Sequence, residues 1–262
     1  SNAIEKVRSL AALQEIQNSS DTAREVLLTA LNDTDPIIRA KVVGWVNWEN
    51  AKNKQTASNL LQHMVKNDPD ASVRVQCAKA LANFNDSALF NVLSNLSNDS
   101  LYSVAGYALQ GIAKLLPLEA YRIAKGLEKD ARGKLLESIS ELYANYGDSS
   151  QNVFFEDKIA KFFGRSRSKL MEEYTSFCTR LHQKEVYSRA LEFFTERAQN
   201  ESNTTCRYQA ILSLHNMLDA LQQKNFPANE AIDTNLLKSS IQNIINQEKS
   251  SVVVDLLKLK GL

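Results

Sequence analysis

The chain has 262 residues, and its 31 basic and 30 acidic side chains leave a formal net charge of +1 at pH 7. This balance excludes a whole-protein field that steers a nucleic acid or an anionic membrane, so a charged partner must meet a local patch. The 8 Gly and 4 Pro residues make up about 5% of the chain, against roughly 12% in average proteins, which predicts long helices and short loops. No apolar run approaches the roughly 20 residues that cross a bilayer, so we expect no membrane partner.

Apolar residues recur at helical spacing along the chain, which predicts an all-α protein. In chain order, amphipathic helices are predicted at 23–31, 57–65 and 88–96, and a copy of one repeated stretch follows each of them. The copies read DTDPIIRAKVVGWVNW at 33–48, DPDASVRVQCAKALANF at 68–84 and, more divergently, DSLYSVAGYALQGIAKL at 99–115. Aligning Arg39 with Arg74 spaces the first two copies by 35 residues, and the third follows 31 residues later.

The second half of the chain continues the pattern less regularly. Two helices are predicted within 118–146, and a turn follows at Gly147-Asp148-Ser149-Ser150. Further helices are predicted at 153–163, 168–182, 184–199, 206–222 and 233–247, before the short apolar tail SVVVDLLKLKGL. The stretch CRYQAILSLHNML at 206–218 repeats the earlier copies and places Arg207 on Arg74.

Helix pairs at a period of about 31 to 35 residues are typical of α-solenoids, in which each pair buries its apolar face against the next. The sequence therefore predicts an all-α, right-handed α-α superhelix, HEAT/ARM-like, of about five or six helix pairs. No boundary divides the chain, so we expect one solenoid domain over 4–262. Ser1-Asn2-Ala3 resembles the scar of a removed expression tag.

The repeat motif is carried by Asp35, Arg39, Asp70 and Arg74. An aspartate at the start of the second helix can accept hydrogen bonds from unpaired backbone N–H groups and meets the positive end of the helix dipole. Proline beside each aspartate is tolerated at a helix start. Small residues at positions 78, 80, 108 and 111 predict a close approach of neighbouring helices.

Two arginines and three aromatic residues are candidates for an interface. Arg39 and Arg74 occupy equivalent positions, so they could contact an acidic partner or pair with neighbouring aspartates in a ladder between repeats. Trp45 and Trp48 are expected three apart on one helix, either capping the first repeats or, together with Tyr107, marking a docking surface, since tryptophan is enriched in interface hot spots.

The pattern DxxxR, followed by alanine and leucine at helical spacing, resembles HEAT repeats at Asp35/Arg39 and Asp70/Arg74. The order VRSLAALQEI, AREVLLTALNDTDPIIRAKVVGWV, DSLYSVAGYALQGIAKL and EAYRIAKGL is similar to the HEAT-like C-terminal region of bacterial zinc aminopeptidases of the aminopeptidase N type. This resemblance implies a non-catalytic domain that helps to enclose a peptide cavity, and it implies as partner a catalytic domain upstream in the same polypeptide. The alternative is a free-standing scaffold that binds a protein or peptide in its concave groove.

The zinc motif HExxH of that family is missing from this chain. Its three histidines, His63, His182 and His215, have no histidine partner four residues away. We therefore expect no catalytic residue, metal or cofactor in this chain and no enzyme activity of its own, with zinc only in the absent catalytic domain. The compartment stays open between the cytoplasm and the periplasm of a bacterium.

Three further groups of residues could form a functional site or have an ordinary structural role. Cys178 and His182 lie four apart and could be half of a metal site or a thiolate with its base, although a buried cysteine fits as well. The stretch FFGRSRSKL at 162–170 could bind phosphates through Arg165, Arg167 and Lys169, but charges in a loop are usually solvated, and we expect no nucleic-acid partner. Gly106 and Gly111 have P-loop spacing without the Lys-Ser/Thr that holds phosphate.

Overall fold

The structure is a computed structural model that describes residues 3–48 and 54–262. Those residues contain helices, turns and loops and no β-strand, which confirms the all-α solenoid. The chain divides into two compact units, Ser1–Ile139 and Ser140–Leu262, and the boundary falls inside helix α9 (Gly133–Tyr146). The expectation of one domain over 4–262 therefore stays a prediction, and Ser1 and Asn2 of the expected tag scar lie outside the described residues.

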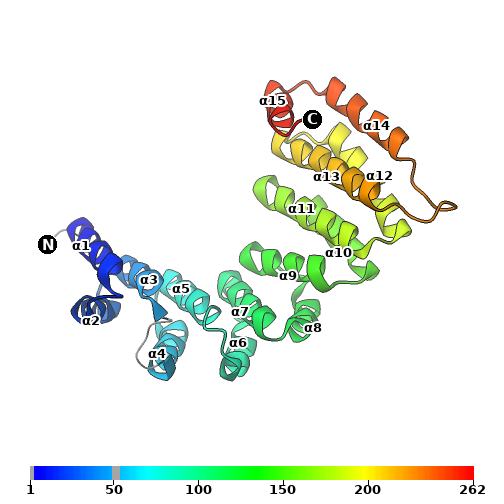
Figure 1. Cartoon of the computed structure of the whole chain (residues 1–262). Coiled ribbons are helices and arrows are strands. Elements are labelled where there is room, and N and C mark those ends of the chain that lie inside the picture. The colour runs from blue at the N-terminus through cyan, green and yellow to red at the C-terminus, as the bar shows by residue number, and fades with distance from the viewer. Residues whose placement is uncertain (1–2, 49–53) are drawn as a thin grey trace. The chain divides into compact units, whose positions relative to one another are not determined.

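Unit 1 consists of two rows of helices. In Figure 1, α1, α3, α5 and α7 form one row, and α2, α4 and α6 form the other. The helices are α1 (Ala3–Ile16), α2 (Asp21–Thr29), α3 (Pro36–Trp45), α4 (Lys54–Asn67), α5 (Ala71–Leu81), α6 (Phe90–Leu96), α7 (Tyr102–Leu115) and α8 (Pro117–Leu127), with 3-10 turns η1 (Ala30–Asn32) and η3 (Ser87–Leu89).

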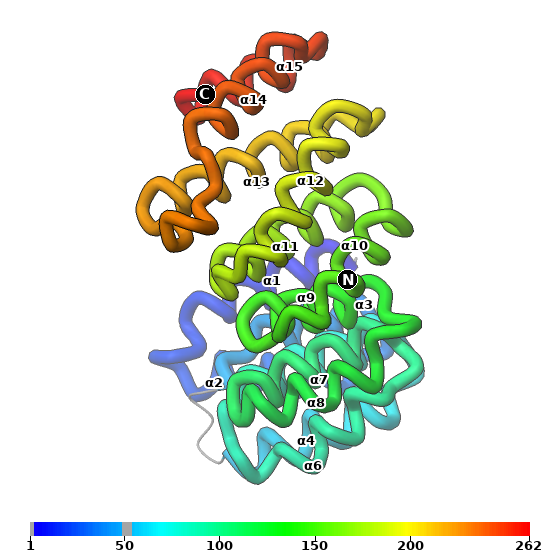
Figure 2. Tube along the Cα trace, turned by 90° about the vertical axis from the view of Figure 1, so that its right-hand side faces the viewer, coloured from blue at the N-terminus to red at the C-terminus, as the bar shows by residue number. Residues whose placement is uncertain are grey.

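Unit 2 continues from α9 with the same alternation. Its helices are η4 (Ser149–Gln151), α10 (Asn152–Lys161), α11 (Gly164–Leu181), α12 (Lys184–Asn200), α13 (Thr204–Gln223), α14 (Thr234–Gln247) and α15 (Ser251–Leu259). Helix α13 packs against α11, α12, α14 and α15 (Figure 2). The segment SVVVDLLKLKGL, expected as a short tail after the last helix, forms a further helix, α15.

Taken two at a time from α2 to α15, the described helices form seven successive pairs, against the five or six that the sequence predicts. The difference arises at the C-terminal end, where α15 begins on a cap of its own. Ser250 accepts a hydrogen bond from the backbone N of Val253 and starts a helix whose Val253 and Leu257 are buried. None of the helices in the described residues is long and apolar enough to cross a membrane.

The predicted caps of the second helices are confirmed. The Asp35 carboxylate accepts from the backbone N of Ile37 at 2.9 Å, and Asp70 accepts from Ser72 N at 2.8 Å. Pro36 occupies the first turn of α3, where the missing N–H has no helical partner. A similar cap begins helix α13 in unit 2, where the Asn203 side chain accepts a hydrogen bond from the backbone N of Cys206 at 3.0 Å.

Glycine lets neighbouring helices of unit 1 approach closely. A Cβ placed on Gly106 would lie 2.5 Å from the backbone carbonyl carbon of Lys134, and one on Gly111 would lie 2.9 Å from Cα of Ala82. The carbonyl of Gly106 also accepts a buried hydrogen bond from Ser138 at 2.9 Å. The two glycines with P-loop spacing thus lie within α7 and serve helix packing.

The ladder predicted for the repeat arginines is confirmed at Arg39. Its Nε and Nη2 donate to the two carboxylate oxygens of Asp68 in the next repeat, each at 2.8 Å. Its Nη1 donates to the carbonyl of Asp33 in its own loop at 2.8 Å. Asp68 in turn accepts from the backbone N of Asp70, so one carboxylate shapes a loop and receives the arginine of the preceding repeat.

The same arrangement recurs along both units. Arg207 donates to both oxygens of Glu248 at 2.8 and 2.9 Å and to the carbonyl of Glu201 at 2.7 Å. Further rungs join Lys6 to Asp33 in unit 1 and Arg167 to Glu201 in unit 2. Arg74 differs, because it donates to the carbonyls of Asp68 and Pro69 in its own loop and makes no ion pair among the described residues.

Substituting Gly106 with alanine should destabilise unit 1 by roughly 2–3 kcal/mol, because the added methyl group meets backbone that cannot move aside. Gly126→Ala is the matched control, since a Cβ at Gly126 in α8 meets nothing within 4 Å. The control should be neutral or stabilising by up to about 1 kcal/mol. Urea denaturation followed by circular dichroism measures both, and equal effects at the two glycines would contradict the packing role.

Arg207→Gln should lower the free energy of unfolding at pH 7 by roughly 2–3 kcal/mol. That is below the roughly 3–5 kcal/mol for fully buried pairs, because water still reaches part of the guanidinium. Arg207 holds the pKa of Glu248 below its usual range. A carboxylate whose pKa is lowered by folding stabilises the protein above its unfolded pKa, and loses that contribution as pH falls through the folded pKa.

The difference between Arg207→Gln and wild type should therefore be full at pH 7 and shrink below about pH 4. Denaturation series at both pH values measure it. Arg122→Gln is the control, because its pair with Glu119 is exposed on both sides and should contribute less than about 1 kcal/mol. A difference for Arg207→Gln that stays constant down to pH 3 would exclude the Glu248 pair as its cause.

Candidate functional site

Helix α3 ends at Trp45 because a side chain from α1's end takes over its last hydrogen bonds. The buried Gln17 donates through Nε2 to the carbonyl of Trp45 at 2.8 Å and accepts from the backbone N of Asn47 at 2.8 Å. Val46 is extended, with φ −62° and ψ 128°, so the chain leaves the helix there. Trp45 and Trp48 consequently do not share one helix, which corrects the sequence-based prediction.

Trp48 folds back against the helix that it follows. Its indole Nε1 donates to the carbonyl of Val43 at 2.8 Å, and its side chain is buried, with 9% exposure. Trp45 is half-buried, and Lys41 Nζ lies 5.7 Å from the centroid of one of its rings. The structure thus gives the two tryptophans different environments, and the docking role of their surface stays a prediction.

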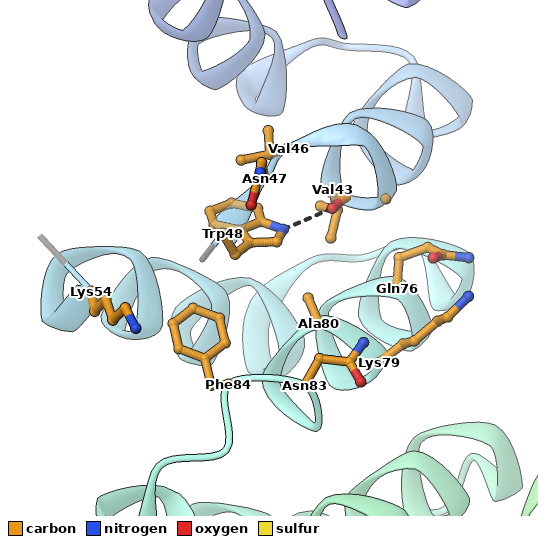
Figure 3. Close-up of a pocket in the computed structure, with 11 residues that line it drawn as sticks. Val43, Val46, Asn47, Trp48, Lys54, Gln76, Lys79, Ala80, Asn83 and Phe84 are labelled. Atoms are coloured by element: carbon orange, nitrogen blue, oxygen red, sulfur yellow. Dashed lines mark hydrogen bonds between the residues drawn. The ribbon is translucent and has the colours of Figure 1, made fainter. Parts of the chain in front are cut away.

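A hollow of about 240 Å³ lies beside Trp48, between the C-terminal ends of α3 and α5 (Figure 3). We name it the α3–α5 hollow. Its apolar wall includes Val43, Val46, Trp48, Ala80 and Phe84. Gly44 contributes bare backbone to the lining. At this volume the hollow fits one or two side chains and falls below the roughly 300–1,000 Å³ of a drug-sized site.

The polar groups that line the α3–α5 hollow are side-chain amides and lysine ammonium groups. The side chains of Asn47, Gln76 and Asn83 line it together with Lys54 and Lys79, and no carboxylate is among the lining residues that the structure describes. Both lysines are exposed, and neither makes an ion pair among the described residues. Among the described residues, the site therefore combines an apolar wall with lysines that make no ion pair.

The positive charge continues beyond the hollow. Helices α3, α5 and α7 contain no Asp or Glu, and each carries one exposed lysine on its solvent side: Lys41, Lys79 and Lys114. Among the described residues, Lys114 Nζ donates to two neutral oxygens, Asn83 Oδ1 at 2.6 Å and the carbonyl of Ala82 at 3.3 Å. These contacts join α7 to the rim of the hollow on α5. We name this surface of α3, α5 and α7 the lysine face.

Tyr107 stands on α7 at the position equivalent to Lys41 and Gln76 in the repeat alignment. Its ring is half-buried, and Lys134 Nζ lies 5.3 Å from the ring centroid. Arg39 and Arg74, also predicted as contacts for a partner, are instead engaged with acids and carbonyls of the loops at the other ends of α3 and α5. Among the predicted interface residues, Trp45 and Tyr107 are therefore partly exposed and outside the arginine ladder, and Trp48 is buried in the wall of the α3–α5 hollow.

A second hollow of about 300 Å³ lies on the other side of Trp48, between α2 and α4. Leu28, Ala57 and Leu60 line its apolar wall. Unlike the α3–α5 hollow, it also contains the carboxylates of Asp21 and Glu25. Trp48 is thus a shared wall between two hollows of different charge.

The structure does not place Cys178 and His182 as a reactive pair. Helix α11 ends at Leu181, and His182 follows in the left-handed region with φ 48° and ψ 47°. Its ring stacks on Phe226 at 4.6 Å, while burial raises the pKa of the fully buried Cys178 thiol well above its usual range. Within residues 3–48 and 54–262, no group of three or more His, Cys, Asp or Glu side chains is arranged to hold a metal ion.

The expected basic loop at 162–170 is largely helix, because α11 begins at Gly164 with φ +54°. Arg167 is buried and pairs with Glu201 at 2.6 Å. Lys169 pairs with Glu172 and Glu173 at 3.1 and 2.9 Å. Two of the three charges proposed for a phosphate-binding strip are thus neutralised locally, and Arg165, the third, is exposed at the start of α11.

Sequence reasoning missed Lys79, Phe84 and the hollow itself. The repeat alignment contains the signal, because Gly44, Lys79 and Gln110 are equivalent, as are Trp48, Asn83 and Lys114. These positions lie in or just after the last turns of α3, α5 and α7, where side chains differ between repeats. The absence of acidic residues from α3, α5 and α7 was also visible in the sequence.

Comparison with known families matches residues 24–113 to HEAT repeats, a range that includes the α3–α5 hollow. Among solved structures, human deoxyhypusine hydroxylase in complex with glycerol has 14% sequence identity and a TM-score of 0.39, with 94% of this chain and 90% of that chain covered. No match was found among curated proteins. The HEAT-repeat prediction is confirmed for 24–113, and neither match names an aminopeptidase.

All three thiols should be silent in the folded protein. Burial raises the pKa of Cys77 to about 12 and also raises those of Cys178 and Cys206. Because the thiolate is the reactive form, a disulfide reagent at about pH 8 should label none of them until denaturant is added. Rapid labelling of Cys178 in the native state would restore the nucleophile hypothesis.

Proposed function

We propose that the chain is a HEAT-repeat scaffold that binds a segment of a partner protein, with an apolar side chain of that segment seated in the α3–α5 hollow. HEAT repeats match the part of the chain that forms the hollow. Stacked helical repeats present extended surfaces to partners, and HEAT proteins use them for protein interactions.

The observation that carries this proposal is the wall of the hollow. Val46, Trp48 and Phe84 present apolar surface from the ends of two successive repeats, and the buried Trp48 is fixed by its hydrogen bond to Val43. A preformed apolar recess with a rigid aromatic wall lets an inserted side chain lose water without ordering the site first. The surrounding amides of Gln76 and Asn83 can hydrogen-bond to the backbone of a bound segment.

The resemblance to the C-terminal region of zinc aminopeptidases remains a prediction. It also assigns this chain a surface that faces a catalytic domain or a peptide, so the same hollow is compatible with it. No observation in the structure favours that setting over a free-standing scaffold. The expectation that this chain has no activity of its own likewise stays a prediction.

A library of random twelve-residue peptides displayed on phage tests the scaffold proposal. Wild-type protein should enrich peptides with a common apolar residue. Ala80→Phe should weaken their binding at least tenfold, because the half-buried Ala80 lines the hollow and a benzyl group there fills it. Ala12→Phe on the exposed side of α1 adds the same group away from the hollow and should bind as wild type does.

Circular dichroism of the two phenylalanine variants checks that both fold. Full binding by Ala80→Phe would show that the peptides bind elsewhere. A library from which wild-type protein enriches no peptide would overturn the proposal.

A further inference from the structure

The lysines around the α3–α5 hollow indicate which kind of protein segment can bind there. Four exposed lysines surround or extend the hollow: Lys41, Lys54, Lys79 and Lys114. Among the described residues, Asp68 lies in the loop before α5, where Arg39 pairs with it, and Asp21 and Glu25 line the separate hollow on the other side of Trp48. In unit 1 the ladder therefore pairs the loop acids Asp33 and Asp68, while the lysines on the bodies of α3, α5 and α7 make no ion pair among the described residues.

We infer that the segment bound by this scaffold is acidic, with an apolar residue for the hollow flanked by carboxylates that meet the lysine face. The inference rests on the proposed function and names the class of its partner. Its physical basis is charge complementarity, since carboxylates beside the seated side chain would lie near ammonium groups that make no ion pair among the described residues. A basic segment would meet the same ammonium groups and be repelled.

The spacing of the charges favours an acidic protein segment over a nucleic acid. The lysines stand one to a helix and alternate with amides and aromatic rings, including Gln76, Asn83 and Tyr107. A polyphosphate backbone is held by a dense track of cations, often with arginine. Here the arginines of α3 and α5 are turned to the loops, and the whole chain carries a net charge of only +1.

Three displayed peptide libraries with the same randomised apolar centre and with flanks fixed as Glu, Gln or Lys test the inference. The Glu-flanked library should yield binders at least tenfold tighter than the Gln-flanked library, and the Lys-flanked library should yield none. Raising NaCl from about 50 to about 500 mM should weaken the Glu-flanked binders and leave the Gln-flanked ones unchanged, because salt screens exposed charges.

Lys41→Gln combined with Lys79→Gln should weaken the Glu-flanked binders about tenfold and leave the Gln-flanked binders unaffected. Lys238→Gln on the exposed side of α14 in unit 2 removes the same kind of charge and should change neither. Both lysines of the double variant are exposed and carry no ion pair among the described residues, so folding should be unchanged. Circular dichroism verifies this.

The outcomes separate the inference from the scaffold proposal. Equal enrichment from the Glu- and Gln-flanked libraries, or preference for Lys flanks, would overturn the acidic segment while the scaffold stands. Failure of all three libraries would overturn both. A single-stranded oligonucleotide of about 20 nucleotides that binds more tightly than the Glu-flanked peptides, and competes with them, would replace the acidic segment with a nucleic acid.

Discussion

The interaction on which the repeats depend is the pairing of a cation near the start of one second helix with the loop acid of the next repeat. Arg39 with Asp68, and Arg207 with Glu248, show it in the two units. Each acid also accepts a backbone N–H two residues on, which sets the turn before its own helix. One carboxylate thus fixes both the start of a helix and its distance from the preceding one. Bidentate geometry between largely buried partners makes these rungs stronger than ordinary surface pairs.

At the C-terminal ends of the helices, side chains from neighbouring repeats donate hydrogen bonds to neutral backbone carbonyls. Gln17 holds the carbonyl of Trp45, Lys114 holds that of Ala82, and Arg180 holds that of Ala144 in unit 2 at 2.6 Å. These bonds satisfy carbonyls that a helix end leaves without a partner. Between the ladder and these bonds, packing depends on side-chain size, as at Gly111. The equivalent Ala80 is half-buried and lines the α3–α5 hollow.

The sequence predicts the repetitive part of this structure well. Asp35, Asp70 and Arg39 act as expected because capping and pairing depend on short, fixed spacings along the chain. Trp48 could not be placed in this way, since the end of α3 is decided by Gln17, which lies 28 residues before Trp45. Arg167 was misread because its partner Glu201 lies 34 residues further on. A hollow is harder still to foresee, since it depends on what several side chains leave unfilled.

Charge separation connects the architecture to the proposed function. A repeat needs acids only at the loops, where they cap helices and receive the ladder cations, so the bodies of α3, α5 and α7 are free of them. The lysines on these bodies keep the surface hydrated without taking part in packing. A surface that is positive for structural reasons can still select its ligand, because α3, α5 and α7 supply no carboxylate of their own to compete with those of a bound segment. The ladder residues of a repeat therefore serve stability, and the lysines of its helix body serve recognition. Residues around Lys79 can differ between repeats without loss of the ladder.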